Sequence, residues 1–503
     1  MACAPACFPA PGPLCVSPFI ATDPVWQEKA QASVQLPNGE AAKELVREEE
    51  SRDFSHLGSP PKLSRRGQDH ASKITPFWNT FDCMLNDGFH PDANEGGIVN
   101  MGIANNSLME DELLEYMHNN FKIEAIDLTY GSSLFGSTRL FQALCTHYNS
   151  ADFSPKVPVL PKHILTSPGC GPLLDQIFEH LADPGDGVLV AAPCYNGFEA
   201  DLTTRSKVHC IPVHCPKDKG HGSEAFNFEG ESALRGFEEA IKDSESKGIK
   251  ITSIIVCNPN NPVGRCYDRG ALLAYGRFAA KHGLHLVFDE IYALSTFPTK
   301  DVDKPQPFIS ALNIDWADES GLHPGYVHIL SSASKDFGLN GFRVGTFVSQ
   351  HNETLVGAMK MTCKLYMVSS PADALFSSLL LNQDYLQGFI KTNRLRLAEA
   401  YDFVRSWCLH HKIDYTPSNA GHFLLVDLSR FMPREIQGRE LEGREAESAL
   451  WAKALDEKVC ITPGFNYHHP EAGTYRLTFS LKRPCLIEGL ARLEKALGLP
   501  PWL

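Results

Sequence analysis

The chain has 503 residues, of which 43% are hydrophobic and 21% charged, so it is long enough to form two or three domains with hydrophobic cores. Its formal net charge is −14 at pH 7, which argues against a nucleic-acid partner because binding a polyanion requires a basic surface. No apolar run approaches the roughly 20 residues that a membrane-spanning helix needs, so we expect no membrane partner.

The 15 cysteines are scattered along the chain and form no CxxC pair. This usage is typical of reduced thiols in a cytoplasmic protein, and it predicts neither a disulfide framework nor a metal site. We therefore expect a cytoplasmic protein without a bound metal.

Residues 1–72 are predicted to be a disordered tail. A stretch rich in Pro, Ala and Cys is followed by the charged run "NGEAAKELVREEESRD" and the turn-rich "GSPPKLSRRGQ". The first twenty residues contain no arginine and no basic n-region, so they resemble neither a secretory signal nor a transit peptide. Lipidation of their cysteines is the alternative to a plain disordered tail.

From about residue 75, short β-branched runs alternate with helical patterns. Strands are predicted at 186–193, 207–213, 251–258, 284–290, 326–332 and 343–348. One intervening helix is expected to carry Leu234, Phe237 and Ile241, and another to cover 271–282. This alternation predicts an α/β domain with a mostly parallel sheet, in which ligands bind at the carboxyl ends of the strands.

After about residue 365 the pattern changes. A long helix is predicted over 384–410, followed by the alternating strand patterns "HFLLVDL" and "GTYRLTFSL", which suit a smaller α+β domain. We expect residues 126–368 to form the large domain. The small domain is then built from 73–125, its N-terminal part, and 369–503, its C-terminal part.

The stretch "SSASKDFGLNGFRVG" (331–345) has the composition of a cofactor site. A lysine that forms an imine with an aldehyde cofactor must be partly neutral and rigidly placed, and Lys335 lies between small residues and a glycine-containing turn. Ser332 and Arg343 flank Lys335 as donors to a phosphate group would.

A second anion site is predicted in "LTSPGCGPLLDQIFEHL". Here a strand ends, small residues follow, and a helix begins with Pro172 in its first turn. The backbone amides of Cys170 and Gly171 would then point at a phosphate group.

Three further segments end predicted strands with polar or aromatic residues. Asp289 in "VFDEIYALS" is the candidate carboxylate for a protonated pyridine nitrogen. Asn261 in "CNPNNPVG" and Tyr292 are placed to hydrogen-bond the ring oxygen. Tyr195 in "APCYNGF" offers an aromatic face on which the ring could stack.

Each of these residues also has an ordinary structural interpretation. Asp289 suits a helix N-cap, Tyr195 a core position, and Asn261 a turn. Lys335 could be a solvated lysine and Arg343 a salt-bridge partner. The common position of all of them at strand ends of one sheet favours a functional site.

With these motifs the sequence resembles the class I/II aminotransferases, a family of fold-type I enzymes of pyridoxal 5′-phosphate (PLP). Within that family it is similar to the 1-aminocyclopropane-1-carboxylate (ACC) synthase-like group, from about residue 100 to about residue 497. The segments "NPNNPVG", "FDEIY" and "SASKDFGLNGFRVG" carry the resemblance. It implies an α/β fold-type I architecture with a large PLP-binding domain and a smaller α+β domain.

The resemblance also assigns roles. It implies Lys335 as the Schiff-base lysine, Asp289 as the partner of the pyridine nitrogen, and Tyr195 as the stacking aromatic. The ring-oxygen ligands are then Asn261 and Tyr292, and the phosphate ligands are Ser332, Arg343 and the amides of Cys170 and Gly171. In "YRLTFS", Arg476 is implied as the residue that binds the α-carboxylate of an amino acid substrate as a bidentate fork. Family members are usually homodimers with shared active sites.

The chain departs from the ACC synthase pattern at three places. Asn105 in "MGIANNSL" replaces the acidic residue that helps to select the sulfonium substrate, and Gly171 replaces a threonine. In "TYGSSLFGSTRLF", Leu134 stands where ACC synthases have a catalytic tyrosine. Tyr130 lies six residues before Gly136, one more than in aminotransferases, and could still reach the phosphate of a neighbouring subunit.

Three reactions are compatible with these residues. Lys335 can remove the α-proton of a bound amino acid, after which transamination, C–S cleavage or cyclopropane formation is open. We favour an aminotransferase, with a C–S lyase or ACC synthase-type elimination as the alternative. A non-catalytic binding or regulatory protein of this fold would be expected to lack Lys335, Asp289 or Arg476. A nicotinamide-dependent dehydrogenase ranks lower, because the phosphate fingerprint GxGxxG is absent.

Overall fold

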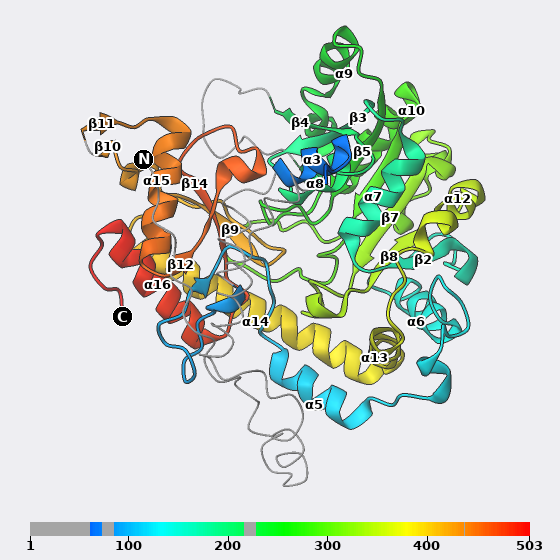
Figure 1. Ribbon diagram of the computed structural model, residues 1–503, viewed down its shortest axis with the longest axis horizontal. Helices are drawn as coiled ribbons and strands as arrows, with labels where there is room; N and C mark the ends of the chain where they lie inside the picture. The colour runs from blue at the N-terminus through cyan, green and yellow to red at the C-terminus, as the bar shows by residue number, and fades with distance from the viewer. Residues whose placement is uncertain (1–60, 73–84, 216–227, 437) are drawn as a thin grey trace. The chain divides into compact units, whose positions relative to one another are not determined.

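The computed structural model describes residues 61–72, 85–215, 228–436 and 438–503 (Figure 1). The chain divides into two units, Met1–Glu95 and Gly96–Leu503. In the first unit, helix α3 spans Arg65–Ser72 and a short bridge joins His90 to Asn94. The tail predicted over residues 1–72 lies outside the described residues except for 61–72.

A seven-stranded sheet lies at the centre of the second unit, with the strand order β2-β8-β7-β6-β5-β3-β4 (Figure 1). Its strands are β2 (Ile164–Ser167), β3 (Gly187–Ala192), β4 (His209–His214), β5 (Ile251–Cys257), β6 (His285–Asp289), β7 (Val327–Ser332) and β8 (Gly345–Val348). The six predicted strands are all present, and the predicted α/β class with a mostly parallel sheet is confirmed. Strand β8 is the exception in direction, since it runs antiparallel to both β2 and β7.

Alternation along the strands explains why both faces of the sheet are covered. In β5, Ile254 and Val256 point into one hydrophobic core, whereas Ile255 and Cys257 point into the other. A strand exposes successive side chains on opposite faces, so a strand that is apolar throughout must be buried on both sides. Such a sheet requires a layer of helices on each face.

Helices α7, α8 and α12 supply the apolar residues of one core, and α6, α9, α10 and α13 those of the other. The helices of the second unit are α5 (Glu110–Asn120), α6 (Thr138–Tyr148), α7 (Cys170–Leu181), α8 (Gly197–Thr203), α9 (Phe237–Ser246), α10 (Arg269–His282), α11 (Trp316–Ser320), α12 (Glu353–Cys363), α13 (Ser370–Leu381), α14 (Gln383–His410), α15 (Gly443–Asp456) and α16 (Arg483–Leu497).

One helix prediction was wrong at its start. Leu234 was expected on the same helix as Phe237 and Ile241, but it ends a 3-10 helix, η4 (Gly230–Leu234). Gly236 has a φ of +88°, a left-handed conformation that separates the two helices.

A second, antiparallel sheet has the order β13-β14-β9, with β9 at Phe423–Asp427, β13 at Thr462–Pro463 and β14 at Thr474–Thr478. Two short pairs complete the strands: β1 (Val99–Asn100) with β12 (Val459–Cys460), and β10 (Glu435–Ile436) with β11 (Arg439–Glu440). The predicted long helix corresponds to α14. Among the described helices, none is long and apolar enough to cross a membrane.

Candidate functional site

The predicted site residues gather at one edge of the large sheet. Strands β5, β6 and β7 are parallel, so their carboxyl ends lie at the same edge, where they are followed by Asn261, Asp289 and Lys335. Strand β8 runs in the opposite direction and therefore begins at that edge, which places Arg343 there as well. The single reversed strand thus brings a cationic side chain to the end of the sheet where the lysine lies.

Lys335 is held by a segment from the start of the second unit. Its Nζ donates a hydrogen bond of 2.8 Å to the carbonyl oxygen of Ala104. Burial, with a further contribution from the nearby Arg476 and Arg343 charges, lowers the pKa of Lys335 to about 8. An appreciable fraction of its amine is therefore neutral near neutral pH, as a nucleophile or base requires.

Asp289 is a buried carboxyl group that no lysine or arginine contacts within hydrogen-bonding distance among the described residues. Burial raises its pKa to about 7, against the effect of a 3.2 Å hydrogen bond from the Ile291 amide. The charge of Asp201 adds to this increase in pKa and that of Lys335 opposes it. A cationic ring nitrogen placed beside Asp289 would restore its ionised form.

The start of helix α7 and Arg343 form a cradle with little free space. Gly169, just before the helix, has a φ of +100°, and a Cβ atom there would lie 2.3 Å from Arg343 Nη2. The guanidinium is fixed by hydrogen bonds from Nη2 to the Pro168 carbonyl, 2.8 Å, and from Nη1 to the Asn340 carbonyl, 2.9 Å. A cation and the amino end of a helix lie together here, as an anion site requires.

The predicted serine of this anion site is also in place. Ser332 ends β7 in a buried position, and its hydroxyl donates a 2.7 Å hydrogen bond to the hydroxyl of Ser334. The Ser334 amide in turn donates to Ser332 Oγ at 2.9 Å. Cys170 and Gly171 form the first turn of α7, as the sequence predicted.

Arg476 lies in β14 and is buried. Its Nη1 donates a 2.8 Å hydrogen bond to Asn261 Oδ1, and its Nη2 donates to the Gly102 carbonyl. The rings of Phe423 and Tyr467 lie 4.7 Å from the guanidinium carbon, and Nε has no partner among the described residues. A buried guanidinium to which no described carboxylate pairs is suited to binding an anionic ligand.

Two aromatic residues lie in the same region. Tyr292 is buried, with its ring edge-on to His422 at 5.2 Å and to Phe423 at 5.3 Å. Tyr195 is half-buried after β3, and its ring packs edge-on against Phe198 at 5.2 Å. Burial raises the pKa of both phenols, so both are protonated hydrogen-bond donors at neutral pH.

The remaining predicted residues, Asn105 and Tyr130, lie at the margin of the candidate site. The Asn105 side chain accepts a 3.0 Å hydrogen bond from Asn340 Nδ2. Tyr130 is 77% exposed and lines a cavity of about 310 Å³ beside α6 and α13, so within one chain it is not grouped with the other site residues. Among the described residues, no group of His, Cys, Asp or Glu is arranged to hold a metal ion.

Sequence reasoning missed two groups, the partly buried Asp201 and the buried His422. The carboxyl of Asp201 on α8 lies 3.1 Å from where a Cβ of Gly171 would be, and burial raises its pKa to about 7. His422, just before β9, hydrogen-bonds Ser295 and has a pKa lowered to about 3 by burial and by Lys335. Asp201 was detectable in principle by its spacing, since it follows the buried Phe198 by three residues on α8. His422 had no such signal.

The comparisons with known proteins identify the family of the chain. The sequence profile described as "Aminotransferase class I and II" matches residues 98–493. An Aspergillus oryzae protein named "Probable aminotransferase aclI" is 32% identical over 440 residues, which cover 87% of this chain and 98% of that protein. An ACC synthase of Cucurbita maxima, CMW33, is 32% identical over 438 residues, covering 83% of this chain and 84% of the other.

Solved structures support the same fold. Bna3p of Saccharomyces cerevisiae superimposes with a TM-score of 0.67 at 18% identity, over 88% of this chain and all of that one. An aspartate aminotransferase variant of Thermus thermophilus gives a TM-score of 0.62 at 18% identity, over 87% and 100% of the two chains. At these identities the structures establish the fold alone. Together with the sequence matches, they show that the chain is a member of the class I and II aminotransferase family, in its ACC synthase-like group.

Proposed function

We propose that the protein is a PLP-dependent aminotransferase that acts on an α-amino acid. The observation that carries the proposal is the position of Lys335, whose pKa is lowered to about 8, at the same sheet edge as Asp289, with Arg476 of β14 hydrogen-bonded to Asn261 at that edge. A base, a partner for a cationic ring and a carboxylate ligand are the three groups that such a reaction needs from the protein.

The residues present fit PLP in three respects. A Cβ at Gly169 would overlap Arg343, so the backbone before α7 and the guanidinium lie close together in this cradle. Backbone amides at a helix start beside a guanidinium suit a phosphate group. The buried Asp289 has no cation in hydrogen-bonding contact in the part of the chain that the structure describes, and it suits a pyridinium nitrogen. The lysine amine is partly neutral. When bound, PLP supplies an electron sink for the negative charge left by loss of the α-proton.

The chain's own residues then have distinct tasks. Arg476 binds the substrate carboxylate through its guanidinium, beside Asn261, and orients the α-hydrogen. With a substrate bound, Lys335 would accept the α-proton on Nζ and return a proton afterwards. We assign Tyr195 to contact with the cofactor ring and Tyr292 to a hydrogen bond with the ring oxygen.

An absorbance spectrum of the purified protein, recorded before and after adding amino acids, tests the proposal. We expect a cofactor band that is missing in Lys335→Ala. Substrate should convert the cofactor to its amine form and release a 2-oxo acid that keeps the side chain. A protein that binds no PLP even when it is supplied in excess would refute the enzyme assignment and leave the binding-protein alternative.

Elimination is the second candidate function, favoured by the similarity to proteins named ACC synthases. In that case the cofactor stays in its aldehyde form, and thiol, ammonia and a 2-oxo acid are released, or a cyclopropane product forms. Leu134 and Asn105 differ from the residues that ACC synthases have at these positions, which is why we rank transamination first. Lys335, Asp289 and Arg476 are all present, which argues against a non-catalytic protein.

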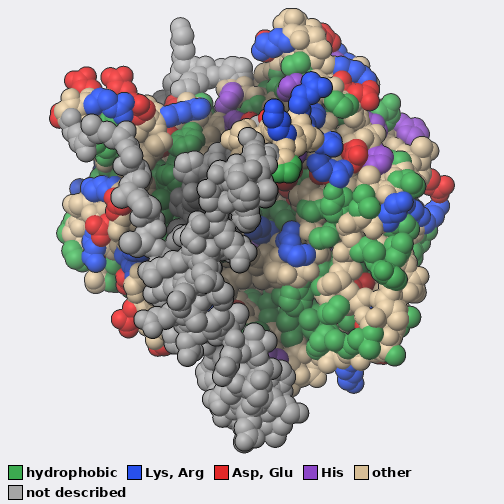
Figure 2. Space-filling model, viewed as in Figure 1, with side chains coloured by type: hydrophobic (Ala, Val, Ile, Leu, Met, Phe, Trp, Pro, Cys, Tyr) green, Lys and Arg blue, Asp and Glu red, His purple; other side chains and the backbone are tan. Residues whose placement is uncertain are grey.

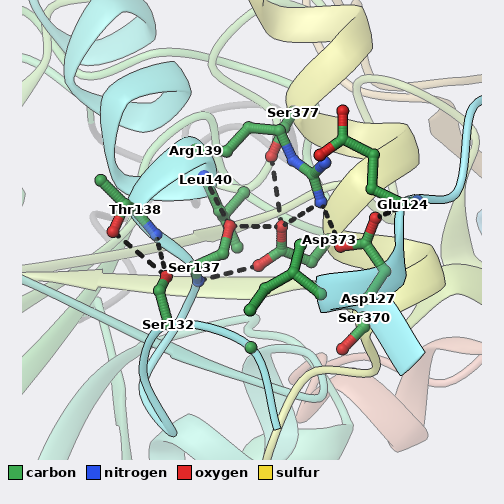
Figure 3. A network of polar contacts seen from close by, with 12 residues as sticks. Glu124, Asp127, Ser132, Ser137, Thr138, Arg139, Leu140, Ser370, Asp373 and Ser377 are labelled. Carbon is green, nitrogen blue, oxygen red and sulfur yellow. Dashed lines mark hydrogen bonds and ion pairs between the residues drawn. The ribbon is translucent and has the colours of Figure 1, made fainter. Parts of the chain in front are cut away.

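We further propose a homodimer in which Tyr130 reaches the phosphate site of the partner subunit. The loop before α6 is anchored to α13 by Asp373, which accepts hydrogen bonds from the Ser137 amide, 2.9 Å, and hydroxyl, 2.6 Å (Figure 3). Arg139 of α6 forms an ion pair with Asp127, with 2.8 Å between Nη2 and Oδ1. The loop is thus held in place while Tyr130 and Leu128 stay exposed.

The surface around this loop has the apolar character of an interface. The space-filling view shows hydrophobic side chains gathered over the region of α6 and α13 (Figure 2). Large exposed apolar residues of this part of the chain are Ile123, Ile126, Leu128, Leu134, Met361 and Leu365. An exposed apolar patch of this kind marks an interaction site. Light scattering tests the dimer, and mixing Lys335→Ala with Tyr130→Phe chains should restore one intact site per mixed dimer.

The domain boundaries and the location complete the proposal. Residues 126–368 contain the whole seven-stranded sheet and are assigned to the cofactor-binding domain, with 73–125 and 369–503 assigned to the smaller one. A cytoplasmic location remains a prediction. The described cysteines are free thiols, which agrees with a reducing compartment.

A further inference from the structure

Arg476 is a buried cation that pairs with no carboxylate among the described residues. Its hydrogen bonds in this part of the chain go to two uncharged acceptors, Asn261 Oδ1 at 2.8 Å and the Gly102 carbonyl. Taking a charge out of water is costly unless other groups compensate for the lost hydration. Two neutral acceptors compensate for only part of this cost, so the guanidinium needs a further source of stabilisation.

Two aromatic rings supply this stabilisation. The guanidinium carbon of Arg476 lies over the ring of Phe423 and over the ring of Tyr467, 4.7 Å from each centroid. Both aromatic residues are buried. The face of an aromatic ring is the negative part of its quadrupole and attracts a cation, most strongly where water is excluded. The rings carry no net charge, so Arg476 keeps its full positive charge.

Most N–H groups of Arg476 have no acceptor in the described part of the chain. A guanidinium has five N–H groups, and the hydrogen bonds to Asn261 and Gly102 use one on each terminal nitrogen. Nε is buried and has no partner among the residues that the structure describes. A protein carboxylate in place of the rings would occupy the N–H groups that the carboxylate of a ligand needs. The aromatic faces stabilise the cation without that competition.

Tyr467 is attached to the structure on two sides. It ends the 3-10 helix η9 (Gly464–Tyr467), whose first amide, that of Gly464, donates a 2.9 Å hydrogen bond to the buried Glu447 carboxyl group. The Tyr467 carbonyl accepts a 2.9 Å hydrogen bond from the amide of Cys194, the residue before Tyr195. This segment is therefore held by α15 at one end and by the loop after β3 at the other.

Phe423 is attached to the segments of the candidate cofactor site. It begins β9, which pairs with β14, the strand of Arg476. Its ring lies edge-on to that of Tyr292, with 5.3 Å between the centroids, and packs in one apolar cluster with Ala104. The Ala104 carbonyl accepts the hydrogen bond from Lys335 Nζ. Both aromatic residues thus connect Arg476 to segments that carry predicted cofactor ligands.

We propose that Phe423 and Tyr467 are positioning residues for the carboxylate of the substrate, on which they act through Arg476. Their rings exclude water from the guanidinium and stabilise its charge, so that its N–H groups stay available to an anionic ligand. The inference rests on the proposed function, because that function makes the ligand the α-carboxylate of an amino acid.

Removing one ring should weaken the binding of carboxylates specifically. In Tyr467→Leu and Phe423→Leu, water gains access to the guanidinium and competes with the carboxylate for its N–H groups. We expect the half-saturating concentration of an amino acid to rise about 5- to 30-fold in each variant, with the rate at saturation changed less than about twofold. Tyr467→Phe keeps the aromatic face and should restore the affinity of the wild-type protein.

Arg430 and Phe431 provide a matched control. The guanidinium carbon of Arg430 lies 4.6 Å from the centroid of the Phe431 ring, close to the distance found in both contacts of Arg476. Phe431 ends the 3-10 helix η8 (Ser429–Phe431), which follows β9, whereas Phe423 begins that strand. Phe431→Leu therefore removes a similar contact beyond the other end of β9. It should lower the stability without changing the response to amino acids.

The experiment is an absorbance titration of the PLP-loaded wild-type protein and the four variants with the standard L-amino acids. For the amino acid that acts at the lowest concentration, the titration is repeated with the amine that lacks its carboxylate. We expect Tyr467→Leu and Phe423→Leu to lose affinity for the amino acid and to respond to the amine like the wild-type protein. An equal loss for amino acid and amine indicates general loosening of the site and would overturn the inference. So would unchanged titrations in both leucine variants, or an equal loss in Tyr467→Phe or Phe431→Leu.

A second measurement does not depend on the cofactor. Denaturant unfolding of the cofactor-free wild-type protein, Arg476→Met, Tyr467→Leu and the double variant forms a thermodynamic cycle. Tyr467→Leu should raise the unfolding equilibrium constant at least about fivefold more when Arg476 is present than in Arg476→Met. Additive losses would overturn the inference. Failure of the proposed function gives a different result: the wild-type protein has no cofactor band, whereas the cycle still shows the coupling between the ring and the arginine.

Discussion

Replacing Gly169 by alanine should damage the phosphate cradle far more than an ordinary glycine substitution. Two effects add at this position. The φ of +100° is one that side chains rarely adopt, and the new Cβ would lie 2.3 Å from Arg343 Nη2 and 2.9 Å from its Cζ. The backbone of Gly169 also lies against Gly345, where a Cβ would be 2.5 Å from the Gly169 carbonyl carbon.

The two effects can be separated by a matched variant. Gly185 has a nearly equal φ of +97° but no atom within 4 Å of its Cβ position. Backbone strain of this kind costs about 1–3 kcal/mol, and Gly185→Ala should cost only that. Gly169→Ala should also displace the guanidinium from the Pro168 and Asn340 carbonyls, and each of these charge-assisted bonds contributes about 1.5–3 kcal/mol where solvent is excluded. Because Arg343 is exposed to solvent, we expect these bonds to contribute at the lower end of this range. Gly169→Ala should then destabilise the protein by about 2–3 kcal/mol more than Gly185→Ala does.

Two measurements check this expectation. Denaturant unfolding of the cofactor-free proteins gives the stability difference between the variants, and absorbance titration gives the affinity for PLP. Gly185→Ala should bind PLP like the wild-type protein, whereas Gly169→Ala should bind at least tenfold more weakly. If the two variants lose equal stability and bind PLP equally well, the close approach of Gly169 to Arg343 has no role in the cradle.

Three further variants test other groups. Arg476→Lys keeps the charge but loses the bidentate fork, so kcat/KM for amino acids should fall about 30- to 100-fold, mainly through KM, with an unchanged cofactor spectrum. Asp289→Asn cannot become an anion beside the ring nitrogen, so turnover should fall at least about 100-fold in steady-state assays while Lys335 still binds PLP. Burial lowers the pKa of His328 well below its usual value, so only the unfolded state binds a proton there as the pH falls below about 6.5. The unfolding free energy should therefore decrease from pH 6.5 toward pH 5, less steeply in His328→Phe, when measured by denaturant titration.

The strands of the large sheet were predictable because each is a short run of apolar residues between turn signals. The direction of β8 was not. A buried run such as Gly345–Val348 has the same composition whether it lies parallel or antiparallel to its neighbours. The direction of β8 was indicated instead by the segment that precedes it. Residues 333–344 contain no α-helix that could return the chain to the opposite edge of the sheet, so β8 had to run antiparallel to β7.

The site was predictable where its residues lie next to one another in the sequence. Lys335, Ser332 and Arg343 come from a single stretch, and Asp289 from a single strand end. His422 and Asp201 come from segments with no chemical pattern of their own and reach the site only through folding. Their contribution depends on burial and neighbouring charge, which local sequence does not specify.

Burial favours the uncharged form of the lysine and of two carboxyl groups in the candidate site. It lowers the pKa of Lys335 to about 8 and raises those of Asp289 and Asp201 to about 7. Arginines keep their charge at any physiological pH, so Arg343 and Arg476 remain as fixed cations. The two guanidinium groups lie at different places: Arg343 lies against the start of α7, and Arg476 lies beside Asn261. A ligand with one anionic group at each arginine would therefore be held at two points on either side of Lys335, whose amine takes up or releases a proton near neutral pH. In the proposed function these two groups are the phosphate of the cofactor and the carboxylate of an amino acid, and reaction at the α-carbon between them follows from where the charges remain.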